Sequence, residues 1–251
     1  MIDRKSPQAM ARMREAGGVL VQAMGLCRGM AKPGVSTLEI DAEVEALIRK
    51  AGARPAFKGY RGFPATICAS INEEVVHGIP AAHRRLKEGD IVGLDLGCIV
   101  DGYYADAAIT LPVGDVPAEV QRLVDVTRES LERAIEQARP GNRLGDISAA
   151  VQRHVEAAGF GVVRAFVGHG IGRELHEDPQ IPNFGEPGTG AVLRPGMVLA
   201  IEPMVTMGHW GVRVLADRWT AVTEDGSLAA HFEHTVAVTD SGPDVLTREA
   251  D

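Results

Sequence analysis

The sequence feature that most constrains the fold is the apolar stretch of residues 91–111, IVGLDLGCIVDGYYADAAITL. Asp101-Gly102 interrupts this stretch at its centre, and an Asp-Gly pair between two apolar runs is a strong signal for a two-residue β-turn. The stretch therefore predicts an antiparallel hairpin in which Val100 faces Tyr103. This register decides which side chains share a face of the sheet.

Each strand of the hairpin carries a carboxylate where a core strand normally has an apolar residue. In the predicted register Asp106 lies opposite Gly97 and on the same face as Asp95, because side chains alternate with a period of two. The two carboxylates are then diagonal neighbours, about 7–8 Å apart at the backbone. Buried like charges at this separation repel, and neither has a Lys or Arg nearby in its strand. One or two metal ions bound between the carboxylates would explain the pattern. The alternative is that one aspartate caps a turn and the other lies on a solvated edge of the sheet.

Composition narrows the class of protein. The 251 residues suffice for one large domain or two small ones. A net charge of −8 without a basic block argues against DNA or RNA as a partner. Three cysteines without C-x-x-C spacing indicate reduced thiols, and neither an apolar signal core nor an apolar run long enough to span a membrane is present. We therefore expect a cytoplasmic protein that does not bind membranes.

Apolar periodicity and chain breakers predict the remaining elements. A helix begins at Ser6-Pro7 and runs to about Met30. Ser36 or Thr37 caps a second helix, which Gly52 ends. Two further helices are predicted at about 117–138 and 145–158, and the C-terminal part is rich in strands, with a hairpin near 212–223.

The chain repeats itself at a constant offset of 107 residues, approximately between 33–95 and 140–202. Pro33-Gly34 corresponds to Pro140-Gly141, and Asp95 falls on Glu202. A shared frame of this length indicates duplication. We therefore expect residues 1–251 to form one domain of two similar helix–helix–strand halves, whose matched carboxylates converge near a pseudo-twofold axis.

The second half of the chain supplies three further candidate ligands. Glu202 ends an apolar strand before Pro203, and Glu233 begins another strand. His169 is flanked by glycines, which allow the backbone to approach a site closely. Taken singly, an acid at a strand end is more often solvated, and a lone histidine is more often structural. Taken together, all lie in or beside apolar or glycine-rich segments.

The candidate ligands resemble the metal-ligand set of the methionine aminopeptidases: Asp95, Asp106, His169, Glu202 and Glu233. The motifs HGIG, IEPM and FEHT surround the last three of these residues. The wider pita-bread metallopeptidases share this set. The resemblance covers essentially the whole chain, and the ligands are spaced by 11, 63, 33 and 31 residues. The third interval leaves no room for the helical insertion of type 2 enzymes. The chain resembles the short bacterial type 1 form, without the N-terminal domain of prolidases.

The resemblance implies an α+β pita-bread fold, with a pseudo-twofold repeat around a central antiparallel sheet, as a single catalytic metallopeptidase domain. It also implies two divalent ions from among Mn²⁺, Fe²⁺, Co²⁺ and Zn²⁺, with availability deciding which of these metals is bound. Asp106 and Glu233 would bridge them, Asp95 would bind one, and His169 and Glu202 the other. Four carboxylates balance the charge of two such ions. A bridging hydroxide would attack the scissile carbonyl, with Glu202 as proton shuttle.

Six further site residues carry over from the family by motif. His77, in VVHGIP, matches a histidine that contacts the substrate backbone, and His176 matches one that stabilises charge on the carbonyl oxygen. The expected methionine pocket is apolar and rich in aromatic and thiol groups: Tyr60, Phe63, Cys68 and Trp219. Phe57 and Leu175 depart from the family pattern, in which these positions are often a cysteine and an aromatic residue.

Two minor sites are also expected. A loop near Asn72 can hold a monovalent cation in the family, although Ala229 replaces a polar residue of its second loop. His234 could orient Glu233 as a hydrogen-bond partner. The remaining histidines are interpreted as structural or surface residues: His83, His154, His209 and His231.

The function implied by the resemblance is removal of the initiator methionine from nascent polypeptides and peptides whose second residue is small. The expected enzyme is a monomer that associates transiently with the ribosome. Two alternatives remain. One is an Xaa-Pro aminopeptidase or dipeptidase of the same fold, which the pocket residues disfavour. The other is a metal-free pita-bread binding module, as in proliferation-associated and histone-chaperone proteins, which lose ligands that are intact here.

Overall fold

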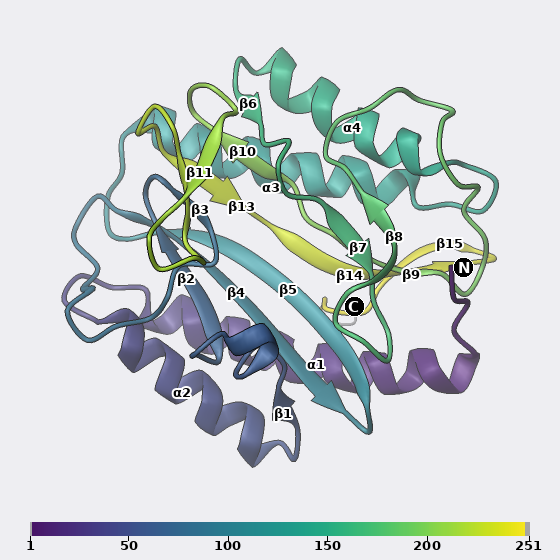
Figure 1. Cartoon of the computed structure of the whole chain (residues 1–251), viewed down its shortest axis with the longest axis horizontal. Helices are drawn as coiled ribbons and strands as arrows, with labels where there is room; N and C mark the ends of the chain where they lie inside the picture. Colours follow the sequence, from purple (N-terminus) through teal and green to yellow (C-terminus); the bar gives the residue numbers. More distant parts are fainter. Residues whose placement is uncertain (1, 249–251) are drawn as a thin grey trace.

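A curled antiparallel sheet forms the centre of the molecule, which we describe from a computed structural model covering residues 2–248 (Figure 1). The main path across this nine-stranded sheet is β1 (Arg54–Pro55), β4 (Ile91–Val100), β5 (Tyr103–Pro112), β14 (Glu233–Thr239), β9 (Val198–Ile201), β7 (Gly168–Gly170) and β8 (Glu177–Ile181). Two strands lie off this path: β2 (Ile67–Ile71) pairs with β4, and β15 (Gly242–Val245) pairs with β14. This is the expected α+β architecture.

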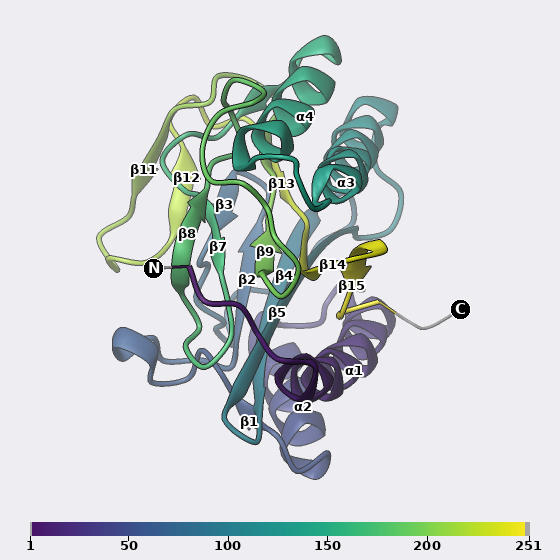
Figure 2. The ribbon, with the colours of Figure 1, turned by 90° about the vertical axis from the view of Figure 1, so that its right-hand side faces the viewer.

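Four long helices accompany the sheet: α1 (Pro7–Met30), α2 (Thr37–Lys50), α3 (Ala118–Gln137) and α4 (Leu144–Ala157). All four lie within about two residues of the bounds expected from the sequence. The side chain of Ser6 accepts a hydrogen bond from the Ala9 amide at the start of α1, and Ser36 with Glu39 forms a capping box on α2. Figure 2 shows α1 and α3 on one side of the central strands β4 and β5, and β7 and β8 on the other.

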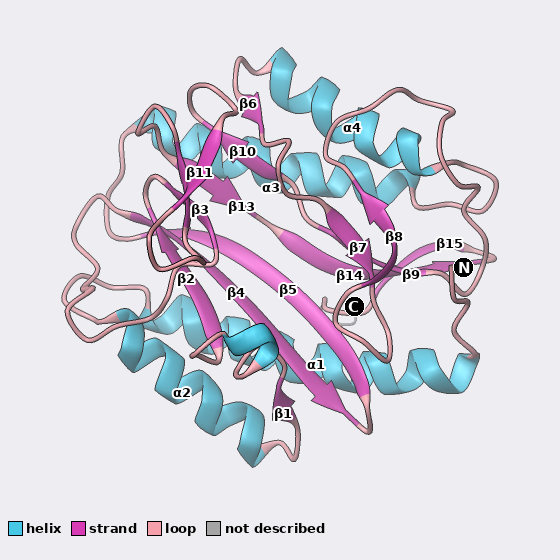
Figure 3. Cartoon of the chain, in the orientation of Figure 1, coloured by secondary structure: helices cyan, strands magenta, loops and turns pink. Residues whose placement is uncertain are grey.

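Two small sheets and a short helix complete the fold (Figure 3). One sheet is ordered β13 (Ala229–His231), β10 (Met204–Thr206) and β6 (Gly161–Val162). The other is ordered β11 (Val212–Val214), β12 (Ala221–Thr223) and β3 (Glu74–Val76), so the hairpin expected near 212–223 is confirmed. A 3-10 turn, η1 (Tyr60–Gly62), lies between β1 and β2.

The central hairpin has the predicted register. Val100 pairs with Tyr103, and Gly97 pairs with Asp106. Asp101 and its glycine neighbour both have positive φ, 47° and 81°, as a type I′ turn requires. Because β4 and β5 are interior strands of the sheet, the alternative of a solvated edge is wrong.

The backbone repeats the offset seen in the sequence. Helices α2 and α4 begin and end 107 residues apart, as do the first residues of β4 and β9. Isolated bridges join Ser36 to Arg85 and Arg143 to Val192 at the same offset. The two halves therefore deliver their carboxylates through equivalent helix–strand frames.

The core fills the space between the sheet and the helices. Fully buried side chains come from α1, α2, α3, α4 and β4, for example Leu20, Ile40, Leu123, Ile147 and Leu94. The three cysteines are buried and unpaired, as the sequence predicts. Within residues 2–248, no helix combines the length and apolarity needed to cross a bilayer.

Candidate active site

Five adjacent strands each place one candidate metal ligand at the middle of the sheet. In spatial order, β4 carries Asp95, β5 carries Asp106, β14 begins with Glu233, β9 is followed directly by Glu202, and β7 carries His169. Cross-strand pairing keeps them in line, since Ala108 pairs with both Asp95 and Glu233. Residues spread over more than half of the chain thus meet at one point.

The glycines around His169 allow β7 to lie tightly between its neighbours. A Cβ on Gly168 would lie 2.4 Å from the Ala200 carbonyl oxygen, and one on Gly170 would lie 2.1 Å from the Asp178 oxygen. The His169 Nδ1 atom lies 2.9 Å from the Gly170 carbonyl oxygen, which can only accept a hydrogen bond. Nδ1 therefore carries the proton in the neutral ring, which leaves the Nε2 lone pair free for a metal.

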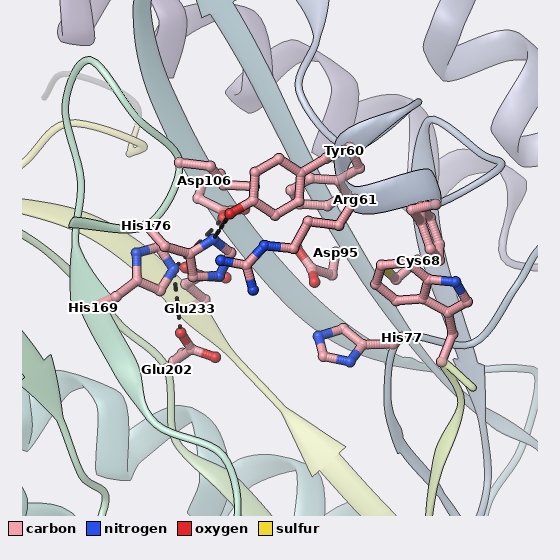
Figure 4. A pocket seen from close by; sticks show the side chains of 14 residues that line it. Tyr60, Arg61, Cys68, His77, Asp95, Asp106, His169, His176, Glu202 and Glu233 are labelled. Atoms are coloured by element: carbon pink, nitrogen blue, oxygen red, sulfur yellow. Dashed lines mark hydrogen bonds and ion pairs between the residues drawn. The ribbon is translucent and has the colours of Figure 1, made fainter. Parts of the chain in front are cut away.

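The candidate ligands converge closely (Figure 4). His169 Nε2 lies 3.5 Å from Glu202 Oε1 and 4.0 Å from Asp106 Oδ2. Ligand atoms of Asp106, His169 and Glu233 all lie within 4.8 Å of one another. Thr235 fixes β5 against β14, because its hydroxyl accepts from the Asp106 amide and donates to the Asp106 carbonyl.

Burial makes this cluster of carboxylates unfavourable without a cation. It raises the pKa of Asp95 to about 7 and the pKa values of Asp106, Glu202 and Glu233 well above the ordinary range, and neighbouring carboxylates raise the last three further. One oxygen of Asp95, Asp106 and Glu233 is buried without a hydrogen-bond partner. Orphaned, converging oxygens and one free imidazole nitrogen fit divalent ions well.

Both histidines predicted to handle substrate lie in the same cavity. His176 is exposed at the cavity surface, and its ring centroid lies 4.2 Å from that of His169. His77 has a left-handed backbone, with φ of 63°, and its ring meets Trp219 and Phe166 edge-on. Burial lowers the pKa of His77 to about 4 and lowers the pKa of His176, so both rings are neutral at pH 7.

The predicted apolar pocket adjoins the ligands in one cavity of about 160 Å³. Phe63 and Trp219 form an edge-to-face pair with centroids 5.0 Å apart, and Cys68 pairs with Asp95 across β2 and β4. Both residues that depart from the family pattern, Phe57 and Leu175, also line the cavity. The structure therefore gathers the predicted metal ligands, substrate histidines and pocket residues around one cavity, with Phe57 and Leu175 in its wall as expected.

The structure corrects two assignments among the histidines. His231, interpreted as structural, lies with Nε2 3.7 Å from Glu202 Oε2, and this nitrogen is buried without a hydrogen-bond partner. His234, by contrast, bonds Thr247 at 2.9 Å and lines a separate cavity beside α1 and α3, so it does not orient Glu233. The sequence held a signal for the position of His231: residues two apart in an extended HFEHT segment share a face, so His231 is expected on the same side as the candidate ligand Glu233.

The loop expected to hold a monovalent cation is held by protein hydrogen bonds. Asn72 has φ of 58°, its carbonyl accepts from the Ala229 amide, and its side-chain oxygen accepts from the Ile91 amide. The cation itself remains a prediction.

A curled antiparallel sheet that gathers four carboxylates and a histidine at its centre defines the pita-bread metallopeptidases. A model of metallopeptidase family M24 matches residues 11–240. The methionine aminopeptidase of Clostridium acetobutylicum is 52% identical over 98% of this chain and 99% of its own. Methionine aminopeptidase 1 of Bacillus subtilis is also 52% identical, over 99% of this chain and 100% of its own. The chain belongs to family M24 and, within it, to the type 1 methionine aminopeptidases.

Solved structures agree. The crystal structure of methionine aminopeptidase from Thermotoga maritima matches with a TM-score of 0.98 at 51% identity, covering 99% of this chain and 100% of that one. Prolidase from Pyrococcus furiosus matches with a TM-score of 0.80 at 25% identity, and the match covers 66% of the prolidase. The fold is thus shared with prolidases, whereas the whole-chain match is to methionine aminopeptidases.

Proposed function

We propose that this chain hydrolyses the peptide bond after an N-terminal methionine, using Asp95, Asp106, His169, Glu202 and Glu233 to hold two divalent ions. The observation that carries the proposal is the convergence of these side chains, from five adjacent strands, beside an apolar pocket. Two divalent ions would balance the four carboxylate charges, whereas one would leave a net negative charge in a buried site. Mn²⁺, Fe²⁺, Co²⁺ and Zn²⁺ all suit this oxygen-rich set with one imidazole.

Bound divalent ions supply Lewis-acid polarisation and lower the pKa of coordinated water. The chain's own residues supply the rest of the chemistry. Glu202 lies between two imidazoles, with one oxygen near His169 and the other near His231, and is placed to accept a proton and pass it to the leaving amine. His176 and His77, both neutral, donate hydrogen bonds to substrate carbonyl oxygens, and His176 stabilises the charge that develops there.

The pocket accounts for specificity. A methionine side chain would lie against Phe63, Cys68 and Trp219, which offer the aromatic and thiol surface that a thioether prefers. With the first side chain in this pocket, the second residue lies beside the ligand cluster and must be small. Leu175 and Phe57 also line this cavity and limit its width.

We further propose that the two repeat-related halves act as one catalytic domain, because each contributes ligands to the same cluster. All candidate ligands come from one chain, which supports action as a monomer. Nascent polypeptides as substrates support a cytoplasmic location and transient contact with the ribosome. A monovalent cation near Asn72 is part of the same proposal.

Peptide hydrolysis tests this function. Protein treated with EDTA and reloaded with Mn²⁺ or Co²⁺ should cleave Met-Ala-Ser but not Met-Leu-Ser or an Ala-Pro peptide. Glu202→Ala should abolish cleavage, whereas Glu136→Gln, a change to an exposed acid of α3, should not. Cleavage before proline alone would indicate an Xaa-Pro peptidase. An absence of cleavage with every metal would indicate a binding module.

A further inference from the structure

The 3-10 turn η1 holds an arginine in an uncommon backbone conformation. Arg61 has φ of 48° and ψ of 24°, between Gly59 and Gly62, whose φ values are 89° and 88°. Left-handed backbone is disfavoured for a residue with a Cβ, and such strain is concentrated at functional sites. The turn directs the side chain of Arg61 to the active-site cavity, which it lines.

The guanidinium of Arg61 lacks a charged partner. Its carbon lies 5.3 Å from the centre of the Tyr60 ring. Among residues 2–248 it forms no ion pair and no hydrogen bond, whereas other arginines pair with a carboxylate, for example Arg12, Arg84, Arg128 and Arg248. Figure 4 shows the side chain extending toward His176. The positive charge of Arg61 also lowers the pKa of His176, second to burial, which places the two groups close together.

Arg61 stands at the mouth of the cavity. Of the side chains that line it, Arg61 and His176 are the exposed ones, whereas the carboxylates lie deep. No other Lys or Arg belongs to the lining. Once bound ions neutralise the carboxylates, the guanidinium is the remaining charge among the side chains that line this cavity, and it lies on the exposed side of the cavity.

The path of the substrate follows from the proposed function, on which this inference rests. The first side chain fills the apolar pocket, and the second lies beside the ligand cluster. The third residue is the first whose side chain is free at the mouth, about 7 Å along an extended chain from the first. An arginine side chain spans a similar distance, so its guanidinium can meet a group on that residue.

We propose that Arg61 makes the enzyme select substrates with a negative charge at the third residue, either an Asp or Glu side chain or the free carboxylate of a tripeptide. A guanidinium can pair with a carboxylate through two parallel hydrogen bonds. A lysine at the same position of the substrate is repelled. The second residue decides whether a substrate fits, and the third decides how well it is held.

Peptides that differ only at the third residue test the proposal. The metal-loaded enzyme is assayed with amidated Met-Ala-Asp-Gly, Met-Ala-Asn-Gly and Met-Ala-Lys-Gly. At low ionic strength we expect kcat/KM to be about five-fold higher for the Asp peptide than for the Lys peptide, since exposed charge pairs contribute modestly. The ratio should fall toward one as salt is added. Equal kcat/KM values in the wild-type enzyme would overturn the proposal.

Substitutions assign the preference to the residue. Arg61→Gly and Arg61→Asn both tolerate a positive φ, and each should bring the Asp-to-Lys ratio to about one. Arg61→Lys should keep the preference, and Arg61→Asp should reverse it. The matched control is Arg153→Asn on α4, which should keep the wild-type ratio. If the preference for the Asp peptide persists in Arg61→Gly, another residue is responsible for it and the proposal is wrong.

Failure of this inference is distinguishable from failure of the proposed function. If the neutral Asn peptide is not cleaved by the metal-loaded enzyme, both proposals fall. If all three peptides are cleaved at one rate, the aminopeptidase function stands and the role of Arg61 is wrong.

Discussion

The hydroxyl of Tyr60 lies 2.9 Å from Nδ1 of His176, and the two rings stack with centroids 5.4 Å apart. Tyr60 belongs to η1 and His176 directly precedes β8, so the contact joins segments distant in the chain. A phenol that donates to Nδ1 selects the neutral tautomer with its proton on Nε2. That tautomer is the one able to donate a hydrogen bond from Nε2 to a substrate carbonyl oxygen.

Tyr60→Phe should therefore lower kcat more than it raises KM. The variant keeps the ring stack but loses the bond that orients and protonates the imidazole correctly. One lost hydrogen bond corresponds to about 1 kcal/mol, or about a five-fold fall in kcat. Steady-state kinetics on Met-Ala-Ser would measure it, with Tyr104→Phe outside the cavity as the control. If kcat/KM falls by the same factor but only because KM rises, with kcat unchanged, Tyr60 contributes to substrate binding and not to the chemical step.

His231 should tighten the metal site through Glu202. Its orphaned Nε2 lies 3.7 Å from Glu202 Oε2, close enough for a small rotation to form a hydrogen bond. Partners of this kind usually alter metal affinity by about tenfold or more. His231→Ala should weaken Mn²⁺ binding by about tenfold in a calorimetric titration of EDTA-treated protein. His154→Ala, which removes a histidine paired with Glu129 on α3, should leave the affinity unchanged.

The sequence predicted much of this architecture because local signals and global fold agree. The Asp-Gly turn fixed the register of β4 and β5, and that register placed Asp95 and Asp106 on one face. The five ligands were recognisable because their flanking motifs are specific. The equivalent helices α2 and α4 were visible as a repeat, since the same Pro-Gly break, apolar positions and terminal glycine recur in both halves.

What the sequence did not predict depends on contacts between distant segments. His231 approaches Glu202 because β13 pairs with β10, which follows Glu202 closely in the chain, and so places His231 opposite Met204. The loop position of Arg61 offers no periodic signal, and its place at the cavity mouth depends on a left-handed turn. The fit of Phe57 against Gly97 is likewise a packing relationship, and no local pattern encodes it.

Gly97 leaves the space that Phe57 occupies, so Gly97→Ala should reshape the substrate pocket. A Cβ at Gly97 would lie 2.6 Å from Phe57 Cε1 and 2.9 Å from the Ala56 Cβ. The aromatic ring would have to move into the cavity, and overpacking of this kind costs about 1–3 kcal/mol. We expect KM for Met-Ala-Ser to rise by about tenfold.

A second substitution and a neighbouring glycine provide the controls for Gly97→Ala. Phe57→Leu in the same protein should lower KM toward the wild-type value, because the smaller side chain relieves the clash with the ring and leaves only the contact with the Ala56 Cβ. Gly93→Ala in the same strand should have little effect, since its added Cβ would meet neighbours no closer than 3.7 Å. A raised KM that Phe57→Leu does not lower would show that the pocket changes for another reason.

Asp95 should make the metal-free protein less stable as the pH rises. Burial raises its folded pKa to about 7, against an ordinary value of 3.8. Between these values the folded state holds a proton that the unfolded chain has released, so stability is lost as the pH rises through the folded pKa. Asp95→Asn has no such proton to lose. Without metal, the variant should gain stability relative to the wild type between about pH 4 and pH 7, the interval between the ordinary and the folded pKa of Asp95.

Comparison of the two proteins at each pH cancels the contribution of the buried histidines, because they titrate in both. Thermal unfolding in EDTA would measure the difference in Tm, which should grow up to about pH 7 and then level off. Saturating Mn²⁺ should reverse the order, since bound cations favour the ionised carboxylate and the wild type keeps one more ligand. The opposite result would contradict this prediction: if the metal-free wild type becomes more stable relative to Asp95→Asn as the pH rises, the folded protein stabilises the ionised carboxylate of Asp95 even without metal.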